Sequence, residues 1–405
     1  MPKRRTILKS LASTLPLGVI GTRRAEAAES EAATDAGRDY FGELGLKPFI
    51  NAAGAYSAFG GARMRPEVVA AMRYAATNKV KMNELHDAVG ARIAALAGSQ
   101  AAMVTSGATA SMVVGTAACM TLGDEEKMRQ LPDATGMKHE VIIQKKHRYT
   151  YDRALTVPGA RLVEVESEQE VRDVAGDSTA MMFFLQPTQK GDNIPADRYV
   201  KLAAELGIPS FCDAATTTPP AMNGVDGVAG GFDLICYSGG KGLRGPYSAG
   251  LLLGRQDLIG FARRHAAPSD ISIGRGMKVA AEEYLGMLVA LETGLRISEA
   301  DDFRYKQDRF DNITSIVSNV PGIVTKTIVS EGHANELYLD IDWDTDVINI
   351  SRTEFVQALR DHNPSVEVRA MMFSAGRIQL SATVMAEGED VMVGEIIRDV
   401  LLAYT

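Results

Sequence analysis

The chain has 405 residues, 46% of them hydrophobic and 23% charged, which is the balance of a globular protein with a sizeable core. Its formal net charge is −8 at pH 7, which disfavours nucleic acid as a partner because Lys and Arg supply most of the affinity for phosphates. The three cysteines are an odd number, two of them in apolar runs, and predict no disulfide framework; no Cys or His spacing predicts a metal site.

Residues 1–27 are predicted to be a twin-arginine-type signal peptide, with a disordered basic tail as the alternative. Arg4-Arg5 precedes an apolar run, 11–21, that is too short to span a bilayer, and Ala25-Glu26-Ala27 has the small-x-small form of a cleavage site. Cleavage would remove six basic residues and one acidic residue and leave a formal charge of −13. We therefore expect a periplasmic protein that is exported folded, with no membrane segment in its mature form and no nucleic-acid partner.

Continuous apolar runs predict the strands of a mostly parallel sheet, because a sheet covered on both faces needs apolar residues on both sides. The runs are residues 101–105, 140–144, 180–185, 209–213, 233–237 and 249–254. Residues 107–121 and 196–206 have helical spacing. Strands alternating with helices predict an α/β domain.

The pattern changes after a long helix-prone stretch at residues 277–297. Beyond it, one strand, a helix, two short strands and a final helix follow, which predicts a smaller α+β unit. The predicted division is therefore an N-terminal segment and large domain at residues 28–300 and a small C-terminal domain at residues 301–405.

Three predicted strands end in chemically active residues, at the edge where open α/β sheets bind ligands. Ser106-Gly107-Ala108 opens a helix whose first N–H groups suit a phosphate, although an empty cap would look the same. Asp213 ends a buried strand and needs a donating partner or a turn to cap. Ser238 and Lys241 follow the next strand in S-G-G-K-G-L-R-G-P, which lacks the Ser or Thr that a Walker lysine requires after it.

Together these groups meet the demands of pyridoxal phosphate, which needs a phosphate site, a carboxylate for its ring nitrogen and a lysine that forms a Schiff base. Six segments resemble fold type I pyridoxal phosphate enzymes: FGELGLKPFINAAGAYSAFGGARM (41–64), VTSGATAS (104–111), HRYTYDRAL (147–155), CDAATTTPP (212–220), SGGKGLRGP (238–246) and IGRGMKVAAEEYLGMLVALE (273–292). They are similar to the selenocysteine synthase (SelA-like) group, in particular its D-glucosaminate-6-phosphate ammonia-lyase branch. The resemblance implies a large α/β cofactor domain, a small C-terminal α+β domain and a homodimer or larger homo-oligomer.

The resemblance assigns the cofactor contacts residue by residue. Lys241 matches the Schiff-base lysine, Asp213 the partner of the ring nitrogen and Ser106-Gly107-Ala108 the phosphate loop. His147 matches a ring that stacks on the cofactor, with a surface-turn histidine as the alternative, and Ala215 lies against the other face.

Two further cofactor contacts follow from the same likeness: Ser238 donates to the phosphate and Gln186 reaches the ring hydroxyl. Arg244 and Arg275 lie in matched motifs and are predicted to hold the acid group of the substrate, because a guanidinium forms a planar fork of donors. A structural ion pair is the alternative for each.

Arg63 and Arg148 are the next candidates for holding the substrate. The resemblance also reveals a departure, because relatives often carry an arginine where this chain has Thr383. Arg369 or Arg377 would compensate for the missing arginine.

The resemblance implies an enzyme that acts on a small amino-acid-like molecule, with Lys241 as the general base. The favoured reaction is that of an ammonia-lyase or dehydratase, which gives a 2-oxo acid, while an amino-acid racemase fits the same residues. Selenium transfer to seryl-tRNA is disfavoured by the acidic charge, the predicted export and the lack of an N-terminal tRNA-binding domain. A non-catalytic cofactor-binding protein is the remaining alternative; Lys241 and Asp213 argue against it, while the departure at Thr383 keeps it open.

Overall fold

The structure is a computed structural model that describes residues 38–186, 194–217, 231–329, 336–370 and 377–405. The chain forms two compact units, Met1–Pro48 and Phe49–Thr405. The described part of the first unit contains the short helix α2 (Tyr40–Glu43), capped by Asp39, which accepts from the backbone N–H of Gly42. The predicted signal peptide lies outside the described residues.

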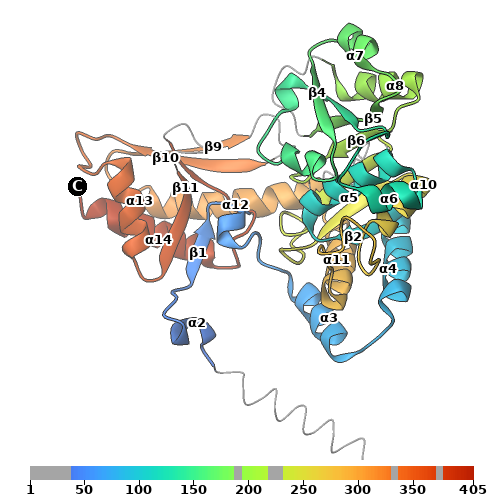
Figure 1. Ribbon diagram of the computed structural model, residues 1–405. Helices are drawn as coiled ribbons and strands as arrows, with labels where there is room; N and C mark the ends of the chain where they lie inside the picture. The colour runs from blue at the N-terminus through green and yellow to red at the C-terminus, as the bar shows by residue number, and fades with distance from the viewer. Residues whose placement is uncertain (1–37, 187–193, 218–230, 330–335, 371–376) are drawn as a thin grey trace, which may run out of the picture. The chain divides into compact units, whose positions relative to one another are not determined.

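The larger of two sheets in the second unit has seven strands in the order β2-β8-β7-β6-β5-β3-β4. β8 is antiparallel to both of its neighbours, and the remaining pairs are parallel, so the predicted mostly parallel sheet is confirmed. Figure 1 labels most of these strands. Their bounds are β2 (Ala101–Thr105), β3 (Glu140–Gln144), β4 (Arg161–Val165), β5 (Thr179–Leu185), β6 (Ser210–Asp213), β7 (Leu234–Ser238) and β8 (Gly250–Gly254).

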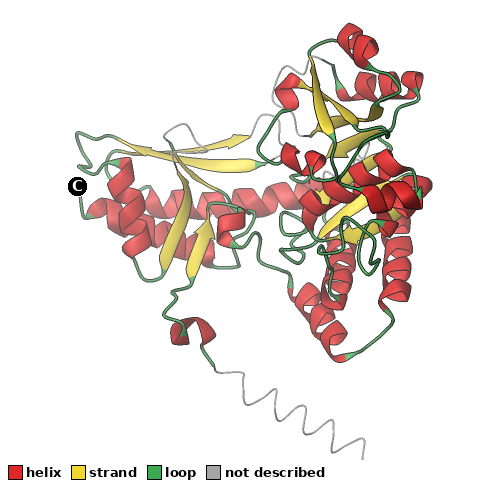
Figure 2. Cartoon of the chain, in the orientation of Figure 1, coloured by secondary structure: helices red, strands yellow, loops and turns green. Residues whose placement is uncertain are grey.

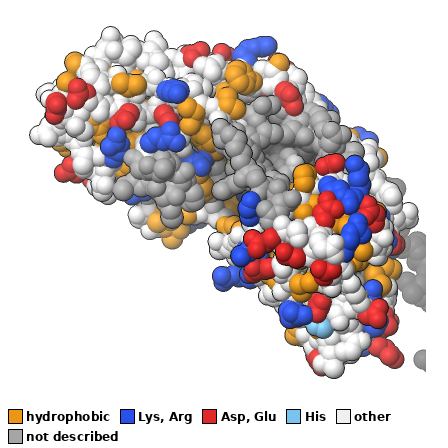
Figure 3. Space-filling model, turned by 90° about the horizontal axis from the view of Figure 1, so that it is seen from above, with side chains coloured by type: hydrophobic (Ala, Val, Ile, Leu, Met, Phe, Trp, Pro, Cys, Tyr) orange, Lys and Arg blue, Asp and Glu red, His pale blue; other side chains and the backbone are white. Residues whose placement is uncertain are grey.

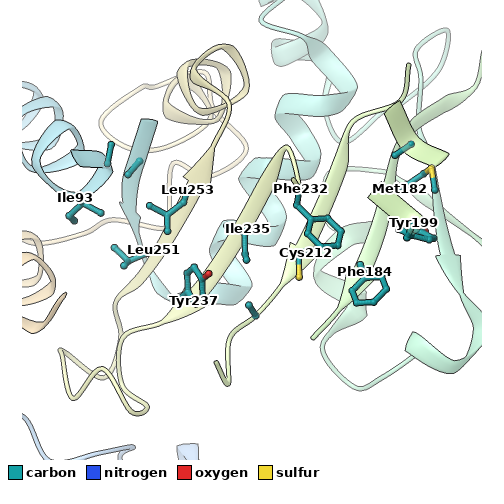
Figure 4. Packing of buried hydrophobic residues seen from close by; sticks show 14 of the residues in the cluster. Ile93, Met182, Phe184, Tyr199, Cys212, Phe232, Ile235, Tyr237, Leu251 and Leu253 are labelled. Carbon is teal, nitrogen blue, oxygen red and sulfur yellow. The ribbon is translucent and has the colours of Figure 1, made fainter. Parts of the chain in front are cut away.

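Neighbouring residues of these strands enter two different apolar clusters, because successive side chains point to opposite faces of a sheet. Ile235 and Leu251 belong to the cluster formed with α4 (Met82–Ala97), α8 (Ala196–Leu206) and α11 (Ala281–Gly294). Leu234 and Leu252 belong to the cluster formed with α5 (Gly107–Thr121) and α10 (Gln256–Arg264). Figure 4 shows the first cluster, in which the labelled side chains come from neighbouring strands and from the covering helices. Burial on both faces explains why the strands read as continuous apolar runs.

Helices lie around the strands of this part, as Figure 2 shows. They are α3 (Pro66–Thr77), α4 (Met82–Ala97), α5 (Gly107–Thr121), α6 (Glu125–Gln130), α7 (Glu168–Val174), α8 (Ala196–Leu206), α10 (Gln256–Arg264) and α11 (Ala281–Gly294). Short 3-10 turns occur at η1 (Ser57–Phe59), η2 (Lys145–His147) and η3 (Asp152–Thr156). α5 is buried along almost its whole length, which fits its apolar sequence and its place against the sheet and α10. No helix in the described ranges is long and apolar enough to cross a bilayer.

The smaller sheet has the strand order β1-β11-β12-β10-β9. Its strands are β1 (Phe49–Ala52), β9 (Ile323–Val329), β10 (Leu337–Trp343), β11 (Ser365–Ala370) and β12 (Ile378–Leu380), and its helices are α12 (Glu299–Val317), α13 (Arg352–Asp361) and α14 (Glu389–Leu402). β1 pairs in parallel with β11, Phe49 opposite Ser365. An N-terminal segment therefore completes the sheet that the C-terminal residues begin, and it carries the adjoining loop into the site described below.

Candidate active site

A cavity of about 760 Å³ lies at the carboxyl ends of β2, β6 and β7. This is the edge at which open α/β sheets bind ligands, and the volume suits a cofactor together with a small substrate. Most of the lining side chains are small or polar. They include Tyr56, Ser57, Ser106, Gly107, Ala108, Thr109, Met112, Tyr151, Asp213, Ala215, Thr216, Ser238, Lys241, Tyr247, Ser248, Glu299, Asp302, Lys306, Glu336, Tyr338, Arg369, Ser381 and Thr383.

The first turn of α5 forms one wall of the cavity, through Ser106, Gly107 and Ala108. The side chain of Ser106, the N-cap residue, makes no capping hydrogen bond, so it does not use the N–H groups of that turn. Gly107 has φ +83°, and a Cβ on Gly250 of β8 would lie 2.5 Å from the carbonyl carbon of Gly107. The sheet can approach the helix start this closely because Gly250 has no Cβ. Free N–H groups and the positive end of the helix dipole make this turn an anion site.

Asp213 is the last residue of β6, is 3% exposed and lines the cavity. One carboxylate oxygen, Oδ1, accepts from the backbone N–H of Ala215 at 2.8 Å, and the Sγ of Cys236 lies 3.5 Å from the same oxygen. The other, Oδ2, accepts from the hydroxyl of Tyr149. Both carboxylate oxygens are therefore held in place by neighbouring groups. A carboxylate that accepts a hydrogen bond from a ligand needs such a fixed orientation.

Tyr149 is a site residue that the sequence reasoning did not single out, although it lies inside the matched segment HRYTYDRAL. Burial is the largest cause that raises the pKa of Tyr149, and the charge of Asp213 adds to it, so its hydroxyl stays protonated and donates. The signal in the sequence that could have pointed to Tyr149 was its position two residues after His147, in the same matched segment. A sequence does not show which member of such a segment reaches the strand-terminal carboxylate.

Lys241 lines the cavity in the loop between β7 and β8. Its glycine neighbours allow this loop to lie against other backbone: the carbonyl of Gly240 accepts from the N–H of Ala62 at 2.8 Å, and a Cβ on Gly240 would lie 2.8 Å from the Cα of Tyr247. Burial lowers the pKa of Lys241, and the negative charge of Asp213 only partly offsets this effect. The amine therefore gives up its proton more readily than a solvated lysine, as a nucleophile and base must.

Ala215 and Ser238 also line the cavity, beside Asp213 and at the end of β7 respectively. The described residues that line it do not include His147 or Gln186. His147 is 1% exposed, and its Nδ1 accepts from the backbone N–H of Leu185 at 3.3 Å while its ring meets Phe184 edge to face. Gln186 lies beside β6, where its backbone N–H donates to the carbonyl of Asp213 at 2.8 Å.

The two preferred substrate arginines, Arg244 and Arg275, are not among the described residues that line the cavity. The Nε of Arg244 donates to the carbonyl of Arg63 at 3.0 Å, which ties the lysine loop to the segment before α3. Arg275 is exposed. Arg63 forms an ion pair with Glu389 at 2.7 Å, and Arg148 pairs with Asp152.

Arg369 is the arginine that lines the cavity, and its guanidinium carbon lies 4.2 Å from the ring centre of Tyr338. Arg377, the other compensating candidate, pairs instead with Asp340 at 2.9 Å. Thr383 lines the cavity and donates to Glu336 at 2.6 Å. Thr383, the position at which relatives often carry an arginine, therefore lies in the site, and Arg369 on β11 supplies a guanidinium there.

No family model matches the chain. Over 370 residues it is 28% identical to 5'-C-glycyluridine monooxygenase-decarboxylase from Streptomyces sp, covering 86% of this chain and 89% of that protein. It is 25% identical over 371 residues to D-glucosaminate-6-phosphate ammonia lyase from Salmonella typhimurium (strain 14028s / SGSC 2262), covering 88% of this chain and 96% of that protein.

A solved structure of D-glucosaminate-6-phosphate ammonia-lyase superposes with a TM-score of 0.79 at 24% identity, over 91% of this chain and 99% of the other. A structure of serine palmitoyltransferase from S. paucimobilis with bound PLP superposes at 0.54 and 12% identity, over 89% of each chain. The chain has the fold of fold type I pyridoxal phosphate enzymes. The predicted fold class is therefore confirmed.

The residues present fit the cofactor that this fold implies. The first turn of α5, the carboxylate of Asp213 and the amine of Lys241 open into one cavity. They match in turn the phosphate, the ring nitrogen and the aldehyde of pyridoxal phosphate. Among the described residues no group of three or more His, Cys, Asp or Glu side chains is arranged to hold a metal ion.

Proposed function

We propose that this protein is a pyridoxal-phosphate-dependent ammonia-lyase that converts a small hydroxylated amino acid into a 2-oxo acid and ammonia. The observation that carries the proposal is the meeting of Lys241, Asp213 and the start of α5 in one cavity. The similarity to an ammonia lyase over 88% of the chain supports the reaction class.

Different residues of the chain would bind different parts of the cofactor. The N–H groups at Gly107 and Ala108 would hold the phosphate, and Asp213 would accept from the ring nitrogen, while Ser238 lines the same cavity at the end of β7. When bound, the cofactor supplies an electron sink for negative charge that develops at the substrate α-carbon.

Lys241 moves the proton. Its lowered pKa raises the fraction of neutral amine, which can accept the α-proton as general base. Arg369, which lines the same cavity, would bind the carboxylate of the substrate. Loss of the β-hydroxyl as water leaves an enamine, and uptake of water then releases ammonia and the 2-oxo acid.

The test is to incubate the purified, cofactor-loaded protein with D- and L-β-hydroxy amino acids and sugar amino acids. Ammonia and 2-oxo acid should appear in equal amounts, which is the stoichiometry of the proposed elimination. Exchange of the α-proton with deuterated solvent, without ammonia, would make the protein a racemase. Absence of both reactions would favour a non-catalytic cofactor-binding protein.

A second candidate function comes from the other curated relative, a monooxygenase-decarboxylase with 28% identity over 86% of this chain. An activity of that class would consume O2 and release CO2, neither of which the elimination does. An oxygen electrode in the same incubation separates the two. Selenium transfer to seryl-tRNA has less support, because the chain is acidic.

We also propose that the mature protein is a periplasmic homodimer or larger homo-oligomer. The twin-arginine pattern at Arg4-Arg5 supports export in the folded state. The resemblance to fold type I enzymes, which build their active sites at subunit interfaces, supports the oligomer.

A further inference from the structure

Among the residues that the structure describes, the wall of the cavity formed by α12 and the smaller sheet carries more negative than positive charge. Its acidic residues are Glu299, Asp302 and Glu336, and its basic residues are Lys306 and Arg369. On the outer face of the molecule seen from above, by contrast, acidic and basic side chains are interspersed, as the space-filling view in Figure 3 shows. Inside the cavity the balance decides which ligand charges fit.

Lys306 is not available to a ligand as a free cation. Its side chain is 6% exposed, and its ammonium lies 2.8 Å from Asp302 and 3.0 Å from Glu336. Burial alone would lower the pKa of Lys306, but the two carboxylates outweigh burial and raise it. Lys306 therefore stays charged, and its charge is neutralised by its own neighbours.

Glu336 is held as a hydrogen-bond acceptor at the cavity surface. Its Oε2 accepts from Lys306, while its Oε1 accepts from Thr383 at 2.6 Å and from Ser381 at 3.4 Å. A carboxylate fixed by three donors has a set orientation and keeps lone pairs for a further donor. Together with Arg369 it offers an acceptor and a cation to the same ligand.

Other polar groups on this side of the cavity are hydroxyls, from Tyr56, Ser57, Tyr338 and Thr383. Hydroxyls and carboxylates pair well with the hydroxyl groups of a polyol, which both donate and accept. A phosphate dianion would meet carboxylates here, and Arg369 would have to serve it and the substrate carboxylate at once.

We propose that the substrate is an amino acid with a hydroxylated side chain and no phosphate, and that Glu336 is the residue that selects against the phosphate. This inference rests on the proposed function and defines its substrate class. D-Glucosaminate and D-glucosaminate 6-phosphate differ only in the phosphate and are the matched probes.

The experiment uses the cofactor-loaded protein and measures binding and chemistry separately. The fast change in cofactor absorbance on mixing gives a dissociation constant for each probe, and ammonia release gives turnover. We expect D-glucosaminate to bind at least ~10-fold more tightly than its 6-phosphate, the order of one charge-assisted contact in a partly buried site. Glu336→Gln should narrow this ratio, mainly because the phosphorylated probe binds better without the negative charge.

Two further variants keep the test decisive. Asp340→Asn removes a carboxylate of β10 that pairs with Arg377 and is not among the described cavity residues, so the ratio should stay as in the wild type. Thr383→Arg adds a positive charge beside Glu336 and should shift the ratio toward the phosphorylated probe. Thr383→Arg keeps the proposal testable if the Glu336→Gln variant fails to fold.

The proposal is overturned if the phosphorylated probe binds more tightly to the wild type, or if Glu336→Gln and Thr383→Arg leave the ratio where Asp340→Asn leaves it. It is also overturned if neither probe changes the absorbance. In that last case, ammonia from another hydroxy amino acid would leave the proposed function standing and remove only the substrate class.

Discussion

Replacing Tyr149 by phenylalanine removes the hydroxyl that donates to Oδ2 of Asp213 and leaves the ring in place. Asp213 is 3% exposed, so water cannot readily replace the lost donor. A hydrogen bond to a charged group contributes ~1.5–3 kcal/mol, and we expect the free energy of unfolding of the cofactor-free protein to fall by about that amount.

The loss should be smaller in the loaded protein, because the ring nitrogen then brings a proton donor to the same carboxylate. The assay is urea denaturation of both forms at pH 8, compared with wild type. Tyr151→Phe is the matched control: this tyrosine lines the cavity two residues further on and is 56% exposed, and its removal should change neither value by more than ~0.5 kcal/mol. Equal losses with and without the cofactor would refute the placement of Asp213 at the ring nitrogen.

Lys241→Ala should bind the cofactor without covalent attachment, so borohydride should no longer fix it to the protein; fixation in the variant would assign the covalent bond to another lysine. Burial lowers the pKa of His86 to about 3, so its stabilising effect is complete above the unfolded value of ~6.5 and is lost as the pH falls toward 3. At pH 5 the protein should have lost about 2 kcal/mol of stability through this group, and His86→Asn should abolish that part of the acid sensitivity in urea titrations at pH 8 and pH 5. Replacing Arg4 and Arg5 by lysine should retain a folded protein in the cytosol, and its continued appearance in the periplasm on cell fractionation would contradict the twin-arginine route.

The central strands and two of the helices of the large sheet were predictable because their signals are local. Helix α5 (Gly107–Thr121) and helix α8 (Ala196–Leu206) begin and end where the sequence predicts. The buried strands read as apolar runs because both faces of the sheet are covered. β4 (Arg161–Val165) escaped prediction, since as an edge strand it is only partly buried and carries polar residues.

The smaller sheet was harder, because its first strand comes from the other end of the sequence. β1 (Phe49–Ala52) pairs with β11 more than 300 residues later, and four residues carry too little periodicity to predict such a partner. The loop after β1 brings Tyr56 and Ser57 into the cavity. A pairing of this kind depends on tertiary packing between segments that lie far apart in the sequence.

The sequence by itself predicted which strand-end residues would meet in the cavity. Ser106-Gly107-Ala108 and Lys241 follow strands and Asp213 ends one, and parallel strands place their carboxyl ends at one edge. The tertiary structure alone decided which cations and carboxylates line the cavity. Arg369 lines the cavity while Arg244 binds a backbone carbonyl, because the reach of a long side chain depends on the neighbours that pack around it and not on its position in a motif.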